Sequence, residues 1–194
     1  LEILAENFQR LGIGAPYHII LYASNGMQWA TRIWAMLEAI GFTKVSVLDG
    51  GLKEWQRLGF ATEAGVNEFQ PADFGAQINS NLFIGKERVL SALGQDGCIL
   101  LNSLTEDIFS GKSRRYGRPG RIPGSINIPF HELIDTGSGK LISPNDAARI
   151  FRDKNITPEL KIVNYCGGGI AATLDAFVLY QLGFENLVIY DDSL

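Results

Sequence analysis

Cysteine and histidine are scarce in this sequence, and long apolar runs are absent. Two cysteines, Cys98 and Cys166, cannot form a disulfide framework, so they indicate a reducing compartment such as the cytoplasm. The two histidines, His18 and His131, have no metal-ligand spacing to either cysteine. No segment approaches the roughly 18 consecutive apolar residues of a transmembrane helix, and no secretory signal opens the chain. The sequence therefore predicts neither a metal site nor a membrane partner.

An excess of positive charge is also missing. The 194 residues carry a formal net charge of −4, with 17 Lys and Arg against 21 Asp and Glu. This balance gives no electrostatic reason to bind nucleic acid or an anionic membrane surface. Apolar residues make up 46% of the chain, which is enough for a packed core, and the length allows one large domain or one and a half ordinary ones. The composition does not define an oligomeric state.

One stretch, Lys161–Phe184, combines a short strand, a glycine loop and a helix around a thiol. Its parts in order are an apolar run, the thiol, three glycines and a helical pattern: Ile162–Tyr165, Cys166, Gly167–Gly169 and Ala171–Leu182. Glycines allow several backbone N–H groups to converge on one point. Together with a helix N-terminus, such a loop holds an anion and lowers the pKa of a cysteine from about 8.5 toward neutrality. The pattern predicts a reactive thiol, and the alternative is an inert cysteine packed at a strand end.

The first part of the chain repeats the order of the last part. At one constant offset, Phe8, Ile13, Ile19 and Tyr22 match Phe151, Ile156, Ile162 and Tyr165. After the loop, with the offset one residue shorter, Ala30-Thr31, Gly41-Phe42, Val47 and Asp49 match Ala172-Thr173, Gly183-Phe184, Ile189 and Asp191. Self-similarity at a long, fixed offset indicates duplicated domains. The later copy also contains residues 81–145, whose counterpart would precede Leu1. We therefore expect residues 1–70 to be the C-terminal half of a first domain with its connector, and residues 71–194 to be the second, catalytic domain, also shortened at its end.

Strands alternate with helices in both copies, which is typical of a parallel sheet with helices on both faces. The expected strands are His18–Tyr22, Val45–Leu48, Phe83–Gly85, Cys98–Leu101, Ile126–Ile128 and Ile162–Tyr165. The expected helices are Leu1–Leu11, Trp29–Ile40, Leu52–Leu58, Lys86–Leu93, Thr105–Phe109, Asp146–Arg152 and Ala171–Leu182. Ligands bind such sheets beyond the carboxyl ends of the strands, which is where Cys166 and Asn102 fall. Cys98 lies inside an apolar strand and is predicted to belong to the core.

Three motifs make the chain resemble the rhodanese-like sulfurtransferases with two tandem domains. They are Arg118–Phe130 (RPGRIPGSINIPF), the strand, thiol and loop NYCGGGIA, and the paired segments SVLDGGLKEW and VIYDDSL. The resemblance covers nearly the whole chain. It implies an α/β fold of two rhodanese-like domains, each a parallel sheet with helices on both faces, the first truncated at its N-terminus. Members carry the catalytic cysteine in the second domain, and the corresponding loop of the first copy here reads ASNGMQ, without a cysteine.

The resemblance implies a sulfurtransferase that moves a sulfane sulfur from thiosulfate or 3-mercaptopyruvate to cyanide or a thiol. Cys166 would be the nucleophile that carries the sulfur as a persulfide, with no metal or organic cofactor. The residues expected to cradle the persulfide are Gly167, Gly168, Gly169, Ile170 and Ala171. The candidates for substrate binding are Arg114, Arg115, Arg118, Arg121 and Asn102, with Arg121 ranked first because it replaces a family histidine. The alternatives are a solvated basic loop for the arginines and a turn cap for Asn102.

Departures from the family pattern leave two other functions open. Gly168 and Ala171 replace a serine and a threonine, and Asn102-Ser103-Leu104 replaces the usual Asp-x-Arg. With these changes, the chain could be a degenerate module that carries sulfur or binds a partner without efficient turnover. The segment 167–172 also fits the dinucleotide pattern Gly-x-Gly-x-x-Ala, with Asp191 downstream for a ribose contact.

Overall fold

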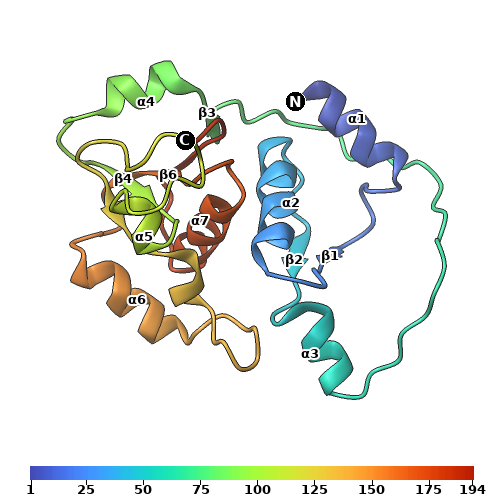
Figure 1. Cartoon of the computed structure of the whole chain (residues 1–194). Helices are drawn as coiled ribbons and strands as arrows, with labels where there is room; N and C mark the ends of the chain where they lie inside the picture. Colours follow the sequence, from blue (N-terminus) through green and yellow to red (C-terminus); the bar gives the residue numbers. More distant parts are fainter.

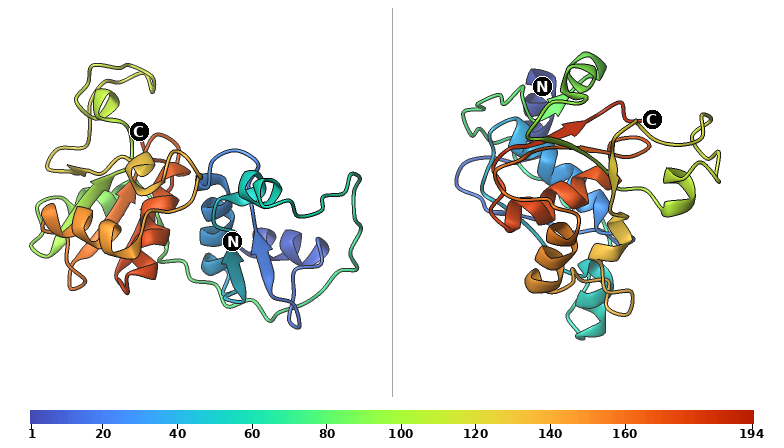
Figure 2. Two further views of the ribbon diagram at one scale, coloured as in Figure 1. Left: turned by 90° about the horizontal axis from the view of Figure 1, so that it is seen from below. Right: turned by 90° about the vertical axis from the view of Figure 1, so that its left-hand side faces the viewer.

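Short runs of β-branched and aromatic residues form the strands of two separate parallel sheets. The computed structural model describes residues 1–194. The smaller sheet pairs β1 (Ile19–Leu21) with β2 (Val45–Val47). The larger one has the order β3-β7-β6-β4-β5, formed by Phe83–Ile84, Leu187–Tyr190, Lys161–Tyr165, Cys98–Asn102 and Ile126–Asn127. We call the parts that carry these sheets the first half and the second half; they lie side by side in Figures 1 and 2.

The helices agree with the expected ones to within a residue or two at most ends. They are α1 (Glu2–Arg10), α2 (Gln28–Ala39), α3 (Gly51–Arg57), α4 (Lys86–Ala92), α5 (Glu106–Phe109), α6 (Pro144–Asp153) and α7 (Ala171–Gln181). The largest shift is at α6, which begins earlier because the Ser143 hydroxyl accepts the Asp146 N–H at 3.2 Å and Pro144 opens the first turn. A 3₁₀ turn, η1 (Phe130–Leu133), was not expected. None of the helices is long and apolar enough to cross a membrane.

Helices cover both faces of the larger sheet, as predicted. Side chains alternate along β6, so that Ile162 faces one side of the sheet while Val163 and Tyr165 face the other. The Ile162 side is packed by α6 and α7, and the Val163 side is packed by α4. Because both faces are buried, the strand from Ile162 onward is apolar apart from Asn164. The Asn164 side-chain amide donates to the Val188 carbonyl oxygen at 3.2 Å.

The two sheets share one register, which confirms the internal repeat. In the first half Ile19 pairs with Val45, and in the second half Ile162 pairs with Leu187, as the sequence offsets require. Helices α2 and α7 pack against each other at the junction of the halves (Figure 2). There the hydroxyls of Thr31 and Thr173, which are equivalent in the two copies, meet at 2.9 Å with both residues fully buried. The duplicated helices therefore contact each other through matching positions.

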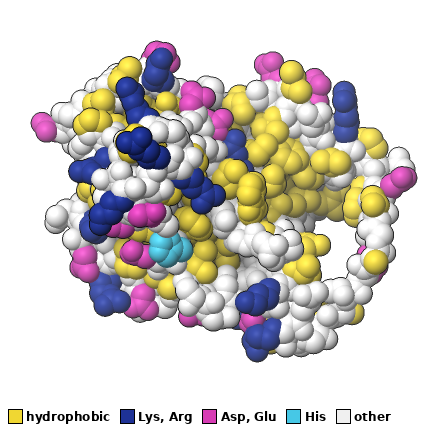
Figure 3. All heavy atoms as spheres, in the orientation of Figure 1, with side chains coloured by type: hydrophobic (Ala, Val, Ile, Leu, Met, Phe, Trp, Pro, Cys, Tyr) yellow, Lys and Arg dark blue, Asp and Glu magenta, His cyan; other side chains and the backbone are white.

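The first half differs from the second in having an open sheet face. Its core lies between the sheet and helices α1 and α2, while Ile20 and Tyr22 on the other face are each 60% exposed. The connector then arcs around this half, leaving a gap that side chains do not fill (Figure 3). The last part of the connector packs on the first half. There the backbone N–H groups of Gln77 and Asn79 donate to the carbonyl oxygens of Ile40 and Ala39. Contacts with the first half thus extend beyond the expected boundary at residue 70.

Candidate active site

Cys166 lies at the carboxyl end of β6, the central strand of the larger sheet. The chain reaches β6 from β5, on one side of the sheet, and continues to β7, on the other side. This change of direction makes the carboxyl end of β6 the position where open α/β sheets bind ligands. Five residues later α7 begins at Ala171, so the loop ends at a helix N-terminus. Cys166 is 2% exposed. Only a small part of the residue is open to solvent, and its thiol lines a cavity described below.

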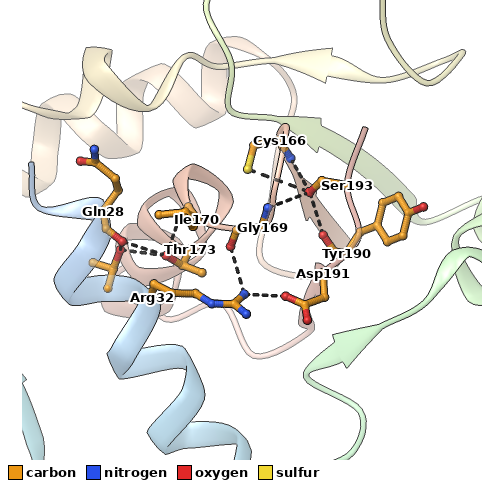
Figure 4. A network of polar contacts seen from close by, with 10 residues as sticks. Gln28, Arg32, Cys166, Gly169, Ile170, Thr173, Tyr190, Asp191 and Ser193 are labelled. Atoms are coloured by element: carbon orange, nitrogen blue, oxygen red, sulfur yellow. Dashed lines mark hydrogen bonds and ion pairs between the residues drawn. The ribbon is translucent and has the colours of Figure 1, made fainter. Parts of the chain in front are cut away.

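Ser193 is the hydrogen-bonding centre of the cysteine loop (Figure 4). Its hydroxyl oxygen accepts the N–H groups of Cys166 at 3.1 Å and Gly169 at 3.2 Å. The hydroxyl donates to the Tyr190 carbonyl oxygen at 2.9 Å and lies 4.0 Å from the Cys166 sulfur. These contacts fix both ends of the loop around the thiol.

Three further loop amides, those of Gly167, Gly168 and Ile170, donate to no group of the protein. Free N–H groups near a sulfur atom can stabilise negative charge that develops on it. The loop therefore combines a fixed frame with amides that are available to an anion.

The side chain of Tyr116 lies directly over Gly167. A Cβ placed on Gly167 would come within 2.1 Å of the tyrosine Cζ, so the ring occupies the space of a side chain at this position. Tyr116 belongs to the basic loop 110–121, which thereby reaches the cysteine loop from the side of β4 and β5. This contact places the loop against Gly167, and it explains why the residue after Cys166 has no side chain.

A cavity of about 390 Å³ opens beside the thiol. Its wall combines Cys166 and its loop with residues from both halves, and most of the lining is apolar: Gln28, Trp29, Leu104, Thr105, Ile108, Arg115, Tyr116, Phe130, Cys166, Gly168, Ile170 and Ala171. Arg115 is the one cation among them, and its guanidinium lies 5.9 Å from the centre of the Tyr116 ring. Such a cavity binds a small organic molecule through one charged group and a largely apolar body.

The other predicted arginines do not line this cavity. Arg121 was ranked first, but its guanidinium lies over the Phe109 ring at 4.5 Å and donates to the Phe109 carbonyl oxygen, so this ranking is corrected. Arg114 and Arg118 are exposed on the same loop. Lys and Arg side chains gather over the second half, the left-hand lobe of Figure 3. Of the candidate arginines, Arg115 alone lines the cavity.

Asn102, the remaining candidate for substrate binding, does not line the cavity either. The residue is fully buried at the end of β4. Its side-chain oxygen accepts the Leu104 N–H at 2.9 Å, which closes a turn two residues long. The Asn127 amide donates to the same oxygen at 3.2 Å. Asn102 therefore shapes the turn that places Leu104 and Thr105 on the cavity wall, as the alternative interpretation of a turn cap required.

Cys98 has a different environment from Cys166. It lies at the start of β4, at the far end of the sheet from the site, and is partly buried. Burial raises the pKa of the Cys98 thiol above its ordinary value, and the nearby Lys161 offsets this only in part. The prediction of a structural role for Cys98 agrees with this position.

Sequence reasoning missed several residues of the site. Ser193 lies in the paired segment VIYDDSL, but its counterpart in the first copy is a glycine, which gave no hint of a hydroxyl role. Tyr116 stood among arginines in a loop with no periodic pattern. Gln28 and Trp29 reach the cavity from the start of α2, in the half that has no cysteine. A search for aromatic residues beside the basic cluster could have found Tyr116.

The fold and the site together define a cysteine-loop α/β protein built on a duplicated domain, and comparison with known proteins identifies its family. Residues 2–58 and 107–194 match the model of the rhodanese-like domain. The chain belongs to the rhodanese-like domain family.

Curated relatives resemble the chain over almost its full length. Human 3-mercaptopyruvate sulfurtransferase is 32% identical over 197 residues, which is 99% of this chain and 66% of the human protein. The protein of the same name from Escherichia coli K12 is 31% identical, over 99% of this chain and 69% of its own length. Chicken thiosulfate sulfurtransferase is 29% identical, over 97% and 66%. The chain thus spans about two thirds of the length of these relatives.

Solved structures show the same fold. The crystal structure of SseA from Escherichia coli superposes with a TM-score of 0.85 at 28% identity. The alignment covers 97% of this chain and 71% of SseA. Wild-type EanB superposes with a TM-score of 0.89 at 21% identity, over 99% of this chain and 51% of EanB. At 21% identity, the similarity to EanB shows a common fold and nothing more.

Proposed function

We propose that the chain is a sulfurtransferase that carries sulfur on Cys166. The observation that supports this most directly is the position of the thiol. Cys166 lines a cavity large enough for a small organic molecule, and Ser193 holds the loop that carries it. Three amides of this loop remain available to an anion. A persulfide anion formed on Cys166 would need just such donors. The names of the curated relatives are consistent with this chemistry.

The reaction has two balanced steps. With 3-mercaptopyruvate, the Cys166 thiolate attacks the donor sulfur, the carbon–sulfur bond breaks, and its electron pair leaves on the enolate of pyruvate, which then takes up a proton. With thiosulfate, the sulfur–sulfur bond breaks and sulfite leaves with the electron pair. In the second step a thiolate or cyanide attacks the outer sulfur, and the thiolate of Cys166 is regenerated.

The cavity favours 3-mercaptopyruvate as the donor. A single guanidinium, that of Arg115, suits one carboxylate, whereas thiosulfate carries two negative charges in a small volume. The loop offers no second cation, because Gly167 and Gly168 have no side chains and Tyr116 covers the first of them. Thiosulfate is therefore the poorer substrate in this proposal.

The experiment compares the wild type with Cys166→Ser, and with Cys98→Ser as the matched control. Pyruvate formation from 3-mercaptopyruvate with dithiothreitol, and thiocyanate formation from thiosulfate with cyanide, are measured side by side. We expect Cys166→Ser to abolish both reactions and Cys98→Ser to retain wild-type rates. Intact mass after donor alone should show one added sulfur atom on the wild type. Turnover by Cys166→Ser at the wild-type rate would disprove the assignment.

The same experiment separates the alternatives. One equivalent of protein-bound sulfur without turnover would indicate a sulfur-carrying module instead of an enzyme. The dinucleotide hypothesis has little support in the geometry of the loop. The Gly169 amide already donates to Ser193, and Tyr116 occupies the approach to Gly167 that a pyrophosphate would need.

A further inference from the structure

The first half, which has no cysteine, contributes an arginine to the cysteine loop. Arg32 extends from α2 toward the second half (Figure 4). Its Nη1 atom donates to the Asp191 carboxylate at 2.6 Å and to the Gly169 carbonyl oxygen at 3.2 Å. The guanidinium also lies 4.8 Å from the centre of the Phe83 ring on β3. Its side chain is 22% exposed, so these contacts are partly shielded from solvent.

The Arg32 and Ser193 contacts hold the cysteine loop at Gly169 from two sides. Gly169 accepts from Arg32 through its carbonyl oxygen, while its N–H donates to Ser193. The Gly169 residue is thus fixed on both sides, in a backbone conformation with φ of 70°. Asp191 lies two residues before Ser193 in the chain, on the segment that follows β7. One guanidinium therefore joins the loop to the segment that supplies the hydroxyl.

We propose that Arg32 is a positioning residue for Cys166, supplied by the first half. Its task is to keep Gly169 and Ser193 in register, so that the loop amides surround the sulfur while it gains and loses its extra sulfur atom. Arg32 does not line the cavity and so does not touch the donor. This inference rests on the proposed sulfur transfer for its kinetic consequence, but its structural consequence can be measured without any activity.

The test uses the whole chain with three variants. Arg32→Ala removes the contacts, and Arg32→Lys keeps the charge without the planar fork. Lys140→Ala is the matched control, because Lys140 forms another ion pair between the halves, to Glu54 at 2.8 Å, which is remote from the cysteine loop. Amide hydrogen exchange over residues 166–170 is measured for each, together with kcat and KM for 3-mercaptopyruvate.

In Arg32→Ala we expect the Cys166 and Gly169 amides to exchange at least about tenfold faster. We expect kcat to fall by about 10- to 100-fold, since a small misplacement of reacting groups can have this effect. KM should change less than about twofold, because ground-state binding is untouched. Arg32→Lys should recover part of the loss, and Lys140→Ala should match the wild type in both measurements.

Three results would overturn the inference, the first two in hydrogen exchange and the third in kcat. The first is wild-type exchange of residues 166–170 in Arg32→Ala. The second is equal acceleration in Arg32→Ala and Lys140→Ala, which would mean that any weakening of the junction has the same effect. If the wild type transfers no sulfur, the proposed function fails, and the exchange data still decide whether Arg32 positions the loop. If the wild type is active and Arg32→Ala keeps its kcat, the positioning role fails alone.

Discussion

Three consecutive glycines follow Cys166, and the structure predicts a different response to alanine at each of them. Gly167 has an ordinary φ, but its Cβ would lie 2.1 Å from the Tyr116 ring. Gly168 also has an ordinary φ, and no atom lies within 4 Å of its Cβ position. Gly169 has φ of 70°, and its Cβ would approach the Asp191 carbonyl oxygen at 2.8 Å. Identical substitutions therefore test three physical causes.

The expected changes in unfolding free energy follow from these contacts. Gly168→Ala should stabilise the protein by about 0.5 kcal/mol, because alanine restricts the unfolded chain and meets no obstacle. Gly167→Ala should destabilise it by about 1 kcal/mol, at the low end for overpacking, since the ring that must move is 37% exposed. Gly169→Ala should cost about 2 kcal/mol or more, because the left-handed conformation and the carbonyl contact act together.

Urea unfolding of the three variants measures these differences, and Tyr116→Ala provides the decisive comparison. If the ring alone opposes a side chain at residue 167, then Gly167→Ala in the Tyr116→Ala background should be neutral or slightly stabilising. The two substitutions should be coupled by about 1 kcal/mol in a double-mutant cycle. Equal effects of alanine at residues 167 and 168, or no rescue by Tyr116→Ala, would refute the placement of the ring over Gly167.

Two further predictions concern the charged groups. Arg115→Ala should raise KM for 3-mercaptopyruvate by about tenfold or more with little change in kcat, as expected for a charged contact present equally in ground and transition state. Arg118 does not line the cavity, so Arg118→Ala should leave KM unchanged. Equal effects of the two substitutions would contradict the role of Arg115. Hydrogen bonds from Arg57 and Lys140 lower the pKa of Glu54 from 4.5 to about 2. Because the folded pKa is the lower one, this carboxylate stabilises the fold fully above about pH 5 and progressively less as the pH falls toward 2. Unfolding at several pH values should show a smaller loss over this range in Glu54→Gln than in the wild type.

Most of the fold could be predicted from local sequence patterns, because the spacing of apolar residues reflects which side chains are buried. The apolar run Ile162–Tyr165 predicted a strand buried on both faces, and the glycines after Cys166 predicted a tight loop. The offset between the copies predicted duplicated domains, and the equivalent pairings of Ile19 with Val45 and of Ile162 with Leu187 agree with this prediction. These features depend on neighbours in the chain or on a repeat, and both are visible in one sequence.

The side chains around the thiol were harder to predict because distant segments bring them there. Loop 110–121 has no periodicity, so nothing indicated that Arg115 would face the cavity while Arg121 packs on Phe109. Asn102 ends its strand in the position typical of ligand-binding residues, yet its side-chain oxygen is engaged by the Leu104 N–H in a turn. The roles of such residues follow from the course of the backbone after the strand ends, which composition and spacing do not determine.

The loss of a cysteine from the first copy did not remove that copy from the site. Ala23 stands at the position of Cys166 in the repeat, so this half has no thiol at the end of β1. Its helix α2 instead packs along α7, where the equivalent threonines meet, and this places Gln28 and Trp29 on the cavity wall and Arg32 against the cysteine loop. A second half alone would therefore have the thiol and the Ser193 frame, but it would lack one wall of the cavity and the guanidinium that joins Gly169 to Asp191. Duplication followed by specialisation explains both the missing cysteine and the retained packing. The contact between the copies supplies part of the cavity wall and the Arg32 contact to the loop that carries the remaining thiol.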